Sequence, residues 1–308
     1  MKIVLEMFLL SLGFLLLVKG ADWFVDGASG IATKLRIPQL VIGLTIVAMG
    51  TSAPEAAVSI SAALKGNADI TIGNIVGSNI LNILIILGLA SALVPIAVAK
   101  STIRVDIPFM LLITGVLLVL GWDGTISLLD GLIMLVLFVG YLAYLFIGAK
   151  NNPEEAPLKD LPLWKSFALT IVGLALIIWG ADLAVDAATS LARIFGISER
   201  FIGLTIVALG TSLPELFTSV FAARKGNADI AIGNIVGSNI FNILFIVGLS
   251  ALIVPVPFAN PFRIDTVIAI LAGIVLLLCA LPRKKLLRWH GILMLALYWL
   301  YLGYLLMV

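Results

Sequence analysis

Long apolar segments follow one another along almost the whole chain, with only short polar stretches between them. Of the 308 residues, 62% are hydrophobic and only 12% are charged. A helix of about 20 apolar residues is long enough to cross a lipid bilayer. Inside lipid, the backbone can satisfy its hydrogen bonds only in helices or closed barrels. The sequence therefore predicts an all-α integral membrane protein.

Ten segments are predicted to be transmembrane helices. They lie near residues 4–30, 37–64, 70–95, 104–121, 127–148, 164–192, 199–224, 230–255, 264–281 and 287–307. If the N-terminus lies outside, the inner loops hold thirteen lysine and arginine residues and the outer side holds five. Because positive charge accumulates on the cytoplasmic side, we expect a multi-pass protein of the cell membrane. Both termini are then extracellular, and the loop 149–163 is cytoplasmic.

One stretch of the chain occurs twice. Residues 41–91 align without a gap with residues 201–251, and 36 of the 51 positions are identical. The repeat divides the chain into a first five-helix unit at 1–150, a linker at 151–163 and a second five-helix unit at 164–308. Because five is odd, the second unit enters the membrane upside down. Inverted repeats are typical of secondary transporters, with the substrate site near mid-membrane, although some channels also have them.

The second and seventh predicted helices contain the repeated sequences "GTSAPE" and "GTSLPE". Pro54 has no N–H, so the carbonyl of Gly50 loses its usual helical partner. Broken helices in membranes are tolerated where they are buried in protein or line a cavity. An ordinary loop-to-helix junction is the alternative, with Ser52 as N-cap and Glu55 in a capping box. The flanking pieces 37–49 and 56–64 are each too short to span, so we expect the break to lie within the membrane.

Each of these sequences ends in a glutamate, Glu55 and Glu215, and no other glutamate lies deep in an apolar segment. An acidic side chain at mid-membrane costs about 2.5–3.5 kcal/mol on insertion scales. Two close carboxylates would also repel each other. A bound cation relieves both penalties.

The repeated "GNIVGSN" segments carry a second polar set. Asn74, Ser78 and Asn82 are spaced i, i+4 and i+8, so they share one face of the third helix. The corresponding residues of the second unit are Asn234, Ser238 and Asn242. Asparagine and serine can also simply fasten helices together, and for Asn74 and Asn234 both interpretations stay open. The other four are expected to be ligands or to lie near a ligand.

Carboxylates, amides, hydroxyls and loosened carbonyls are hard oxygen ligands that suit Ca²⁺ and Na⁺. The chain has one histidine and one cysteine, which excludes a conventional zinc site, and it has no nucleophile–base constellation. A net charge of only +2 gives no reason to expect nucleic-acid binding. The composition thus favours transport of a hard cation over an enzyme.

The paired "GTS-x-PE" and "GN-x-x-GSN" segments resemble the α-repeats of the cation/Ca²⁺ exchanger superfamily, specifically prokaryotic sodium/calcium exchangers. The resemblance covers essentially the whole chain. It implies four clustered cation sites and alternating access, in which the first and sixth helices slide as a tilted pair across the other eight. The residues that it implies as ligands or site-lining groups are Glu55, Glu215, Thr51, Thr211, Ser52, Ser212, Ser78, Ser238, Asn82, Asn242 and the carbonyls of Ala48 and Ala208.

Some archaeal relatives and the potassium-dependent branch of the superfamily carry an aspartate where this chain has Asn242. The predicted centre here, with Asn82 opposite Asn242, is therefore symmetric and less acidic. This argues against potassium dependence. We therefore expect an antiporter that exchanges Na⁺ for Ca²⁺ in the lipid bilayer, with no prosthetic group and no obligate protein partner. The alternatives are a Ca²⁺/H⁺ antiporter, a potassium-dependent exchanger and, less favoured, a cation channel.

Overall fold

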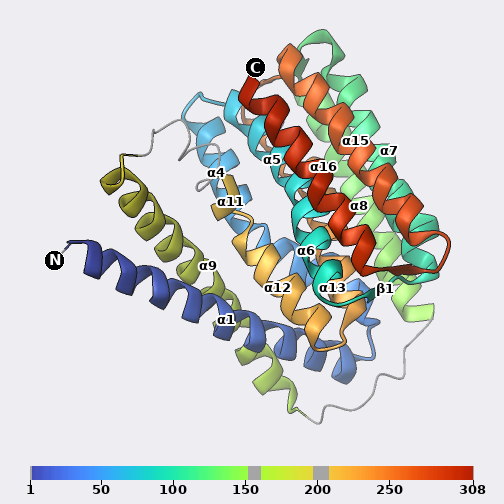
Figure 1. Cartoon of the computed structure of the whole chain (residues 1–308). Coiled ribbons are helices and arrows are strands. Elements are labelled where there is room, and N and C mark those ends of the chain that lie inside the picture. The colour runs from blue at the N-terminus through green and yellow to red at the C-terminus, as the bar shows by residue number, and fades with distance from the viewer. Residues whose placement is uncertain (1, 152–160, 197–207, 308) are drawn as a thin grey trace.

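The computed structural model describes residues 2–151, 161–196 and 208–307, which form an almost entirely helical molecule (Figure 1). Within these residues, seven helices are long and apolar enough to cross a membrane. The bent pair Gln39–Thr51 and Ala53–Leu64 makes an eighth if it is counted as one span. The all-helical membrane class is thus confirmed. The total of ten stays a prediction, because the predicted span 199–224 begins outside the described residues and the helix Arg288–Met307, at the predicted span 287–307, is not among the helices that meet these criteria.

The elements of the two halves follow the same order. The first half comprises α1 (Lys2–Leu35), α2 (Gln39–Ile42), η1 (Gly43–Val47), α3 (Ala48–Thr51), α4 (Ala53–Leu64), α5 (Asp69–Leu81), η2 (Asn82–Leu87), α6 (Gly88–Leu93), β1 (Ile96–Ala97), η3 (Thr102–Asp106), α7 (Ile107–Leu120), η4 (Gly121–Asp123), β2 (Thr125–Ile126) and α8 (Leu128–Asn151). The second half comprises α9 (Leu163–Ile194), α11 (Ala208–Gly210), α12 (Leu213–Arg224), α13 (Ala228–Phe241), η6 (Asn242–Val247), α14 (Gly248–Ile253), β3 (Val256–Pro257), α15 (Asn260–Ala280), β4 (Lys285–Leu286) and α16 (Arg288–Met307).

The longest helices, α1 and α9, run side by side at one edge of the molecule (Figure 1). They have 34 and 32 residues. At about 1.5 Å per residue each is longer than the ~30 Å hydrocarbon core, so each can cross it with a tilt. Glycines bring their backbones together: a Cβ added at Gly173 would lie 2.5 Å from the Phe24 nitrogen, and one at Gly20 would lie 2.8 Å from the Gly173 oxygen. The two helices therefore form one closely packed unit.

The helices that carry the repeated asparagines form the centre of the molecule. In the spans Ile70–Leu93 and Ala228–Ile253, 78% and 83% of the most apolar window is buried, against 17% for Ile3–Leu35. In α13, a Cβ added at Gly233 would lie 3.1 Å from Gly43 of the broken helix, and one at Gly237 would lie 2.7 Å from the Leu44 oxygen. The small residues thus allow the broken helix to approach the centre closely.

Among the described residues, four short segments have π-helical hydrogen bonding, which the apolar pattern did not predict. Two of them, η2 and η6, begin at Asn82 and Asn242. A third, η1, precedes the break after Thr51. π-Helical turns often occur at functional sites. Here Asn82 and Asn242 each stand at the start of such a segment, at equivalent positions of the two halves.

In the described part of the chain, two short antiparallel ribbons join the halves. In one, Ile96 of β1 pairs with Leu286 of β4, and in the other Thr125 of β2 pairs with Pro257 of β3. Each ribbon therefore links a loop of the first half to a loop of the second.

Candidate cation site

The breaks in the two repeated helices lie where the sequence predicts them. Helix α3 ends at Thr51, α4 begins at Ala53, and the two are bent by 50°. Pro54 occupies the first turn of α4, and Pro214 occupies the first turn of α12. Ser52 is the N-cap residue of α4, but its side chain makes no capping hydrogen bond. The side-chain cap of the alternative interpretation is therefore wrong, and the serine hydroxyl has another partner.

That partner is the glutamate of the other half. The Ser52 hydroxyl donates to Oε1 of Glu215 at 2.8 Å. In the reciprocal contact, the Ser212 hydroxyl donates to Oε1 of Glu55 at 3.3 Å. Both glutamates are only 1% exposed. The duplicated motif thus produces two buried carboxylates, each held by a serine from the opposite repeat.

The second oxygen of each carboxylate is not bound by a serine. Among the described residues, Oε2 of Glu55 and Oε2 of Glu215 are buried and have no hydrogen-bond partner. The buried residues of this part of the chain include no lysine or arginine. A buried charge is strongly unfavourable unless it is paired. The pair of glutamates therefore has the electrostatic character of a cation site.

Four asparagines surround the centre. Asn82 Nδ2 donates to Asn239 Oδ1 at 2.9 Å, and Asn242 Nδ2 donates to Asn79 Oδ1 at 3.0 Å. Asn79 and Asn239 each donate to the other's backbone carbonyl at 3.2 Å. The donors of Asn82 and Asn242 are thus occupied, whereas their Oδ1 atoms are buried and unpartnered among the described residues. Two amide oxygens are thereby left available to a ligand.

The sequence interpretation did not include Asn79 and Asn239. The signal that could have found them is the third letter of "GSN", which recurs in both halves three residues before Asn82 and Asn242. Residues three apart lie on the same helical face. These side chains orient the central amides rather than offering their own oxygens.

Asn74 and Asn234, for which two interpretations were open, fasten helices. Asn74 Nδ2 donates to Ser59 Oγ at 2.9 Å, and Asn234 Nδ2 donates to Ser219 Oγ at 2.9 Å. Both also approach a backbone carbonyl, Asn74 that of Glu55 at 3.3 Å and Asn234 that of Glu215 at 3.4 Å. They therefore fix the first turn of each helix that carries a glutamate.

Some of the other predicted site residues lie around the same centre. The Ser238 hydroxyl donates to the Ala48 carbonyl at 3.4 Å, and the Thr51 hydroxyl donates to Asn234 Oδ1 at 2.9 Å. Ser78 is 3% exposed. Ala208 begins α11, directly after residues that lie outside the described part of the chain.

A cavity of about 550 Å³ leads towards this region between α4 and α9. Pro54 and Ala57 of α4 line one side, Asp182 and Asp186 of α9 line another, and Thr211 lies at its lining as well. The first turn after the break and one predicted ligand are therefore next to an open space.

The described residues contain no group of three or more histidine, cysteine, aspartate or glutamate side chains that could hold a metal. Any cation here would depend on two carboxylates together with amide, hydroxyl and carbonyl oxygens. Such a set suits weakly held hard cations better than a permanently bound transition metal.

Comparison with known proteins agrees with a site for hard cations. The family model described as sodium/calcium exchanger protein matches residues 5–147 and again residues 165–307. The putative antiporter CaxA of Alkalimonas amylolytica is 42% identical over 286 residues, which cover 90% of each chain. The sodium/calcium exchanger MaX1 of Methanosarcina acetivorans is 32% identical and matches across 96% of this chain and 97% of its own.

A solved structure has the same fold. The sodium-calcium exchanger NCX_Mj, in crystals soaked with zero Na⁺ and Ca²⁺, matches with a TM-score of 0.87 at 37% identity. The match covers 98% of this chain and 99% of that one. Because the family model covers both halves and the fold agrees over nearly the whole length, this chain belongs to the sodium/calcium exchanger family of membrane transporters.

Proposed function

We propose that this protein exchanges Na⁺ for Ca²⁺ across the cell membrane, with Glu55 and Glu215 as ligands shared by the two ions. One observation carries the proposal: two glutamates and two asparagines each keep one buried oxygen without a hydrogen-bond partner among the described residues. These four oxygens come from both repeats. With no buried lysine or arginine in the described part to neutralise the carboxylates, a transported cation supplies the missing charge.

The remaining ligands would complete a shell around this core. Ca²⁺ takes about 6–8 oxygens, more than the four unpartnered atoms provide. We assign the additional positions to residues that border the broken helices: Thr51, Thr211, Ser52, Ser212, Ser78, Ser238 and the carbonyls of Ala48 and Ala208. Two glutamates neutralise one Ca²⁺, and Na⁺ competes for the same carboxylates.

The architecture that we infer has ten transmembrane helices in two inverted repeats, at 1–150 and 164–308, joined by the linker 151–163. The family model matches once within each half, which supports two equivalent units. The distribution of basic residues supports extracellular termini and a cytoplasmic loop at 149–163. A site between two inverted units can face either side of the membrane in turn.

Exchange then follows from competition. When the site faces outward, Na⁺ displaces Ca²⁺ from the shared carboxylates and the Ca²⁺ leaves on that side. When the site faces inward, Na⁺ is released down its gradient and Ca²⁺ binds again. If three Na⁺ exchange for one Ca²⁺, one charge moves per cycle, which is worth about 2.3 kcal/mol per 100 mV. With only two acidic ligands, the number of Na⁺ ions is a quantity to measure, and the reversal potential in liposomes gives it.

Buried carboxylates can also carry protons, so a Ca²⁺/H⁺ antiporter is the main competing function. A potassium-dependent exchanger and a cation channel built on the same repeat are the others. The three are separated by which ion gradient drives Ca²⁺.

The deciding experiment reconstitutes the purified protein in liposomes and follows ⁴⁵Ca²⁺ uptake against an imposed Na⁺, K⁺ or pH gradient. We expect uptake with an outward Na⁺ gradient and no added K⁺, and loss of uptake in Glu55→Gln and Glu215→Gln. Glu6→Gln, near the N-terminal end of α1, is the matched control and keeps full uptake. Uptake driven by pH but not by Na⁺ would overturn the sodium assignment, and flux without any counter-ion would indicate a channel.

A further inference from the structure

Two turns of identical sequence, "KGN", join the glutamate-bearing helices to the central helices. Gly66 and Gly226 have φ of 79° and 80°, a conformation that favours glycine. In both turns the glycine N–H donates 3.1 Å to the carbonyl three residues before it, and the following asparagine N–H donates at 2.9 Å five residues back. The turns are therefore the same locally, and any difference between them comes from their surroundings.

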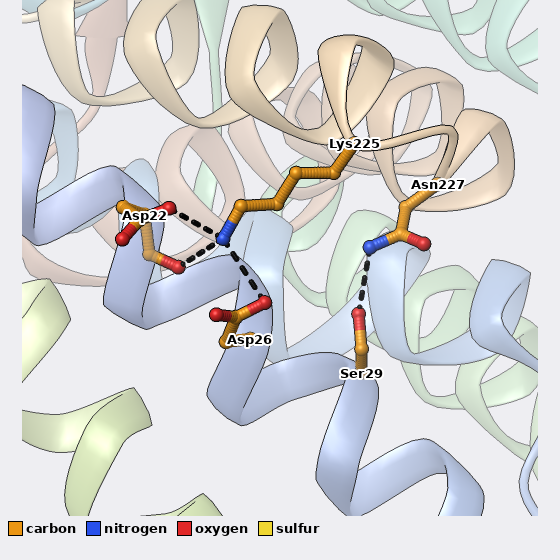
Figure 2. Close-up of polar contacts among 5 residues, drawn as sticks. All are labelled: Asp22, Asp26, Ser29, Lys225 and Asn227. Carbon is orange, nitrogen blue, oxygen red and sulfur yellow. Dashed lines mark hydrogen bonds and ion pairs between the residues drawn. The ribbon is translucent and has the colours of Figure 1, made fainter. Parts of the chain in front are cut away.

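The second turn is bonded to α1 (Figure 2). Lys225 Nζ lies 2.6 Å from Asp22 Oδ1 and 3.0 Å from Asp26 Oδ1, and it also donates to the Asp22 carbonyl at 2.8 Å. Asn227 Nδ2 donates to Ser29 Oγ at 2.9 Å. Asp22, Asp26 and Ser29 are spaced i, i+4 and i+7, so one face of α1 receives the whole turn.

The first turn has the same potential partners on α9, but within the described part of the chain it forms no hydrogen bond or ion pair with them. The positions equivalent to Asp22, Asp26 and Ser29 are Asp182, Asp186 and Thr189. Lys65 and Asn67 are exposed, as are both aspartates. Within the described residues, Lys225 forms ion pairs with both of its aspartates, Asp22 and Asp26, whereas Lys65 forms none. Thr189 Oγ1 is buried with no hydrogen-bond partner in that part of the chain, whereas Ser29 Oγ accepts from Asn227.

The missing contact between the first turn and α9 lies where the structure has a cavity. The cavity of about 550 Å³ separates α4 from α9, and Asp182 and Asp186 line it. The equivalent pair of helices in the other arrangement is α1 and α12, and these two pack directly on each other. One turn is thus fastened where the helices meet, and its equivalent is unfastened where they are apart.

We propose that these two turns are alternating latches of the exchange cycle. The inner latch consists of Lys225 and Asn227 with Asp22, Asp26 and Ser29. It keeps the molecule closed on the side away from the cavity. The outer latch consists of Lys65 and Asn67 with Asp182, Asp186 and Thr189. It forms when the side held by the inner latch opens. The inference rests on the exchange by alternating access and the topology proposed above.

The latches exclude each other because α1 and α9 move together. Their backbones are in close contact at Gly20 and Gly173, so α9 cannot reach the first turn without α1 leaving the second. Each latch therefore biases one of two states, and removing one shifts the population towards the other.

The test measures accessibility rather than transport. With Cys279→Ala as background, Ala57→Cys places one thiol in the cavity, and a membrane-impermeant maleimide is added to the face onto which the cavity opens. We expect Lys225→Met to lower the labelling rate by roughly three- to tenfold, because loss of the inner latch depopulates the state with the open cavity. Lys65→Met, the equivalent change in the other repeat, should leave the rate unchanged or raise it, and Lys225→Arg should restore it.

Equal labelling in the Lys225→Met and Lys65→Met proteins would overturn the proposal. If Lys225→Met does not fold, the milder pair Asn227→Ala and Asn67→Ala gives the same comparison, with slower labelling expected only for the first. Because labelling requires no ion flux, opposite effects of the matched variants would establish the latch even if Na⁺-driven Ca²⁺ uptake were absent. Conversely, Na⁺-driven uptake with equal labelling would leave the exchange function standing without the latch.

Discussion

At the scale of single residues, the site is defined by which atoms have partners and which do not. A serine from each repeat binds one oxygen of the opposite glutamate, at 2.8 Å and 3.3 Å. Asn79 and Asn239 occupy the donors of the two central amides. Each of these contacts fixes a side chain while leaving one oxygen without a partner among the described residues. The surrounding polar residues thus orient ligands instead of neutralising them.

Removing an orienting side chain tests this directly. In Asn239→Ala, Asn82 loses the acceptor that holds its Nδ2, so its amide can rotate and its Oδ1 is no longer fixed. One such hydrogen bond is worth about 1 kcal/mol, so we expect Ca²⁺ affinity to fall roughly fivefold while the protein stays folded. Calorimetric titration of the purified protein with Ca²⁺ measures the change, with the exposed Asn260→Ala as control. An affinity within twofold of the parent would contradict the orienting role.

The sequence predicted the residues that repeat but not how they pair. Glu55 and Glu215 stand out because an acid in an apolar segment is costly. The contact of Ser52 with Glu215 joins residues 163 positions apart, and no local pattern encodes a crossing between halves. Asn79 and Asn239 were overlooked for the same reason, since their partners lie on the opposite repeat.

At the scale of helices, irregular geometry brings polar atoms to the centre. The 50° bend between α3 and α4 follows from Pro54, which the sequence identifies. The π-helical segments that begin at Asn82 and Asn242 contain no proline or other residue that would predict them. They depend on tertiary packing around the central helices and could not be predicted from periodicity.

The contact between α1 and α9 makes a second prediction at this scale. A Cβ at Gly173 would lie 2.5 Å from the Phe24 nitrogen, so Gly173→Ala should push the helices apart. We expect a lower melting temperature and slower exchange. Gly140→Ala is the matched control, because no described atom lies within 4 Å of its added Cβ, and alanine favours the helix by about 1 kcal/mol. If both variants melt and exchange alike, the close packing of α1 on α9 does not matter for the cycle.

At the scale of the whole molecule, two halves of nearly equal sequence are in different surroundings. Lys225 is bound to Asp22 and Asp26, whereas Lys65 is exposed. The repeat predicts that two related states exist, because each half can take the place of the other. It cannot predict which state is the more stable, since the same residues serve both. That choice depends on small differences in packing between the halves.

The central claim is that Na⁺ and Ca²⁺ compete for one pair of carboxylates. Equilibrium binding of ⁴⁵Ca²⁺ to the purified protein, titrated with NaCl against KCl at constant ionic strength and pH, tests it most directly. We predict that Na⁺ displaces Ca²⁺ cooperatively and that K⁺ does not, with no specific Ca²⁺ binding in Glu55→Gln or Glu215→Gln. Ca²⁺ binding that Na⁺ and K⁺ affect equally, or that survives in both glutamine variants, would contradict the account.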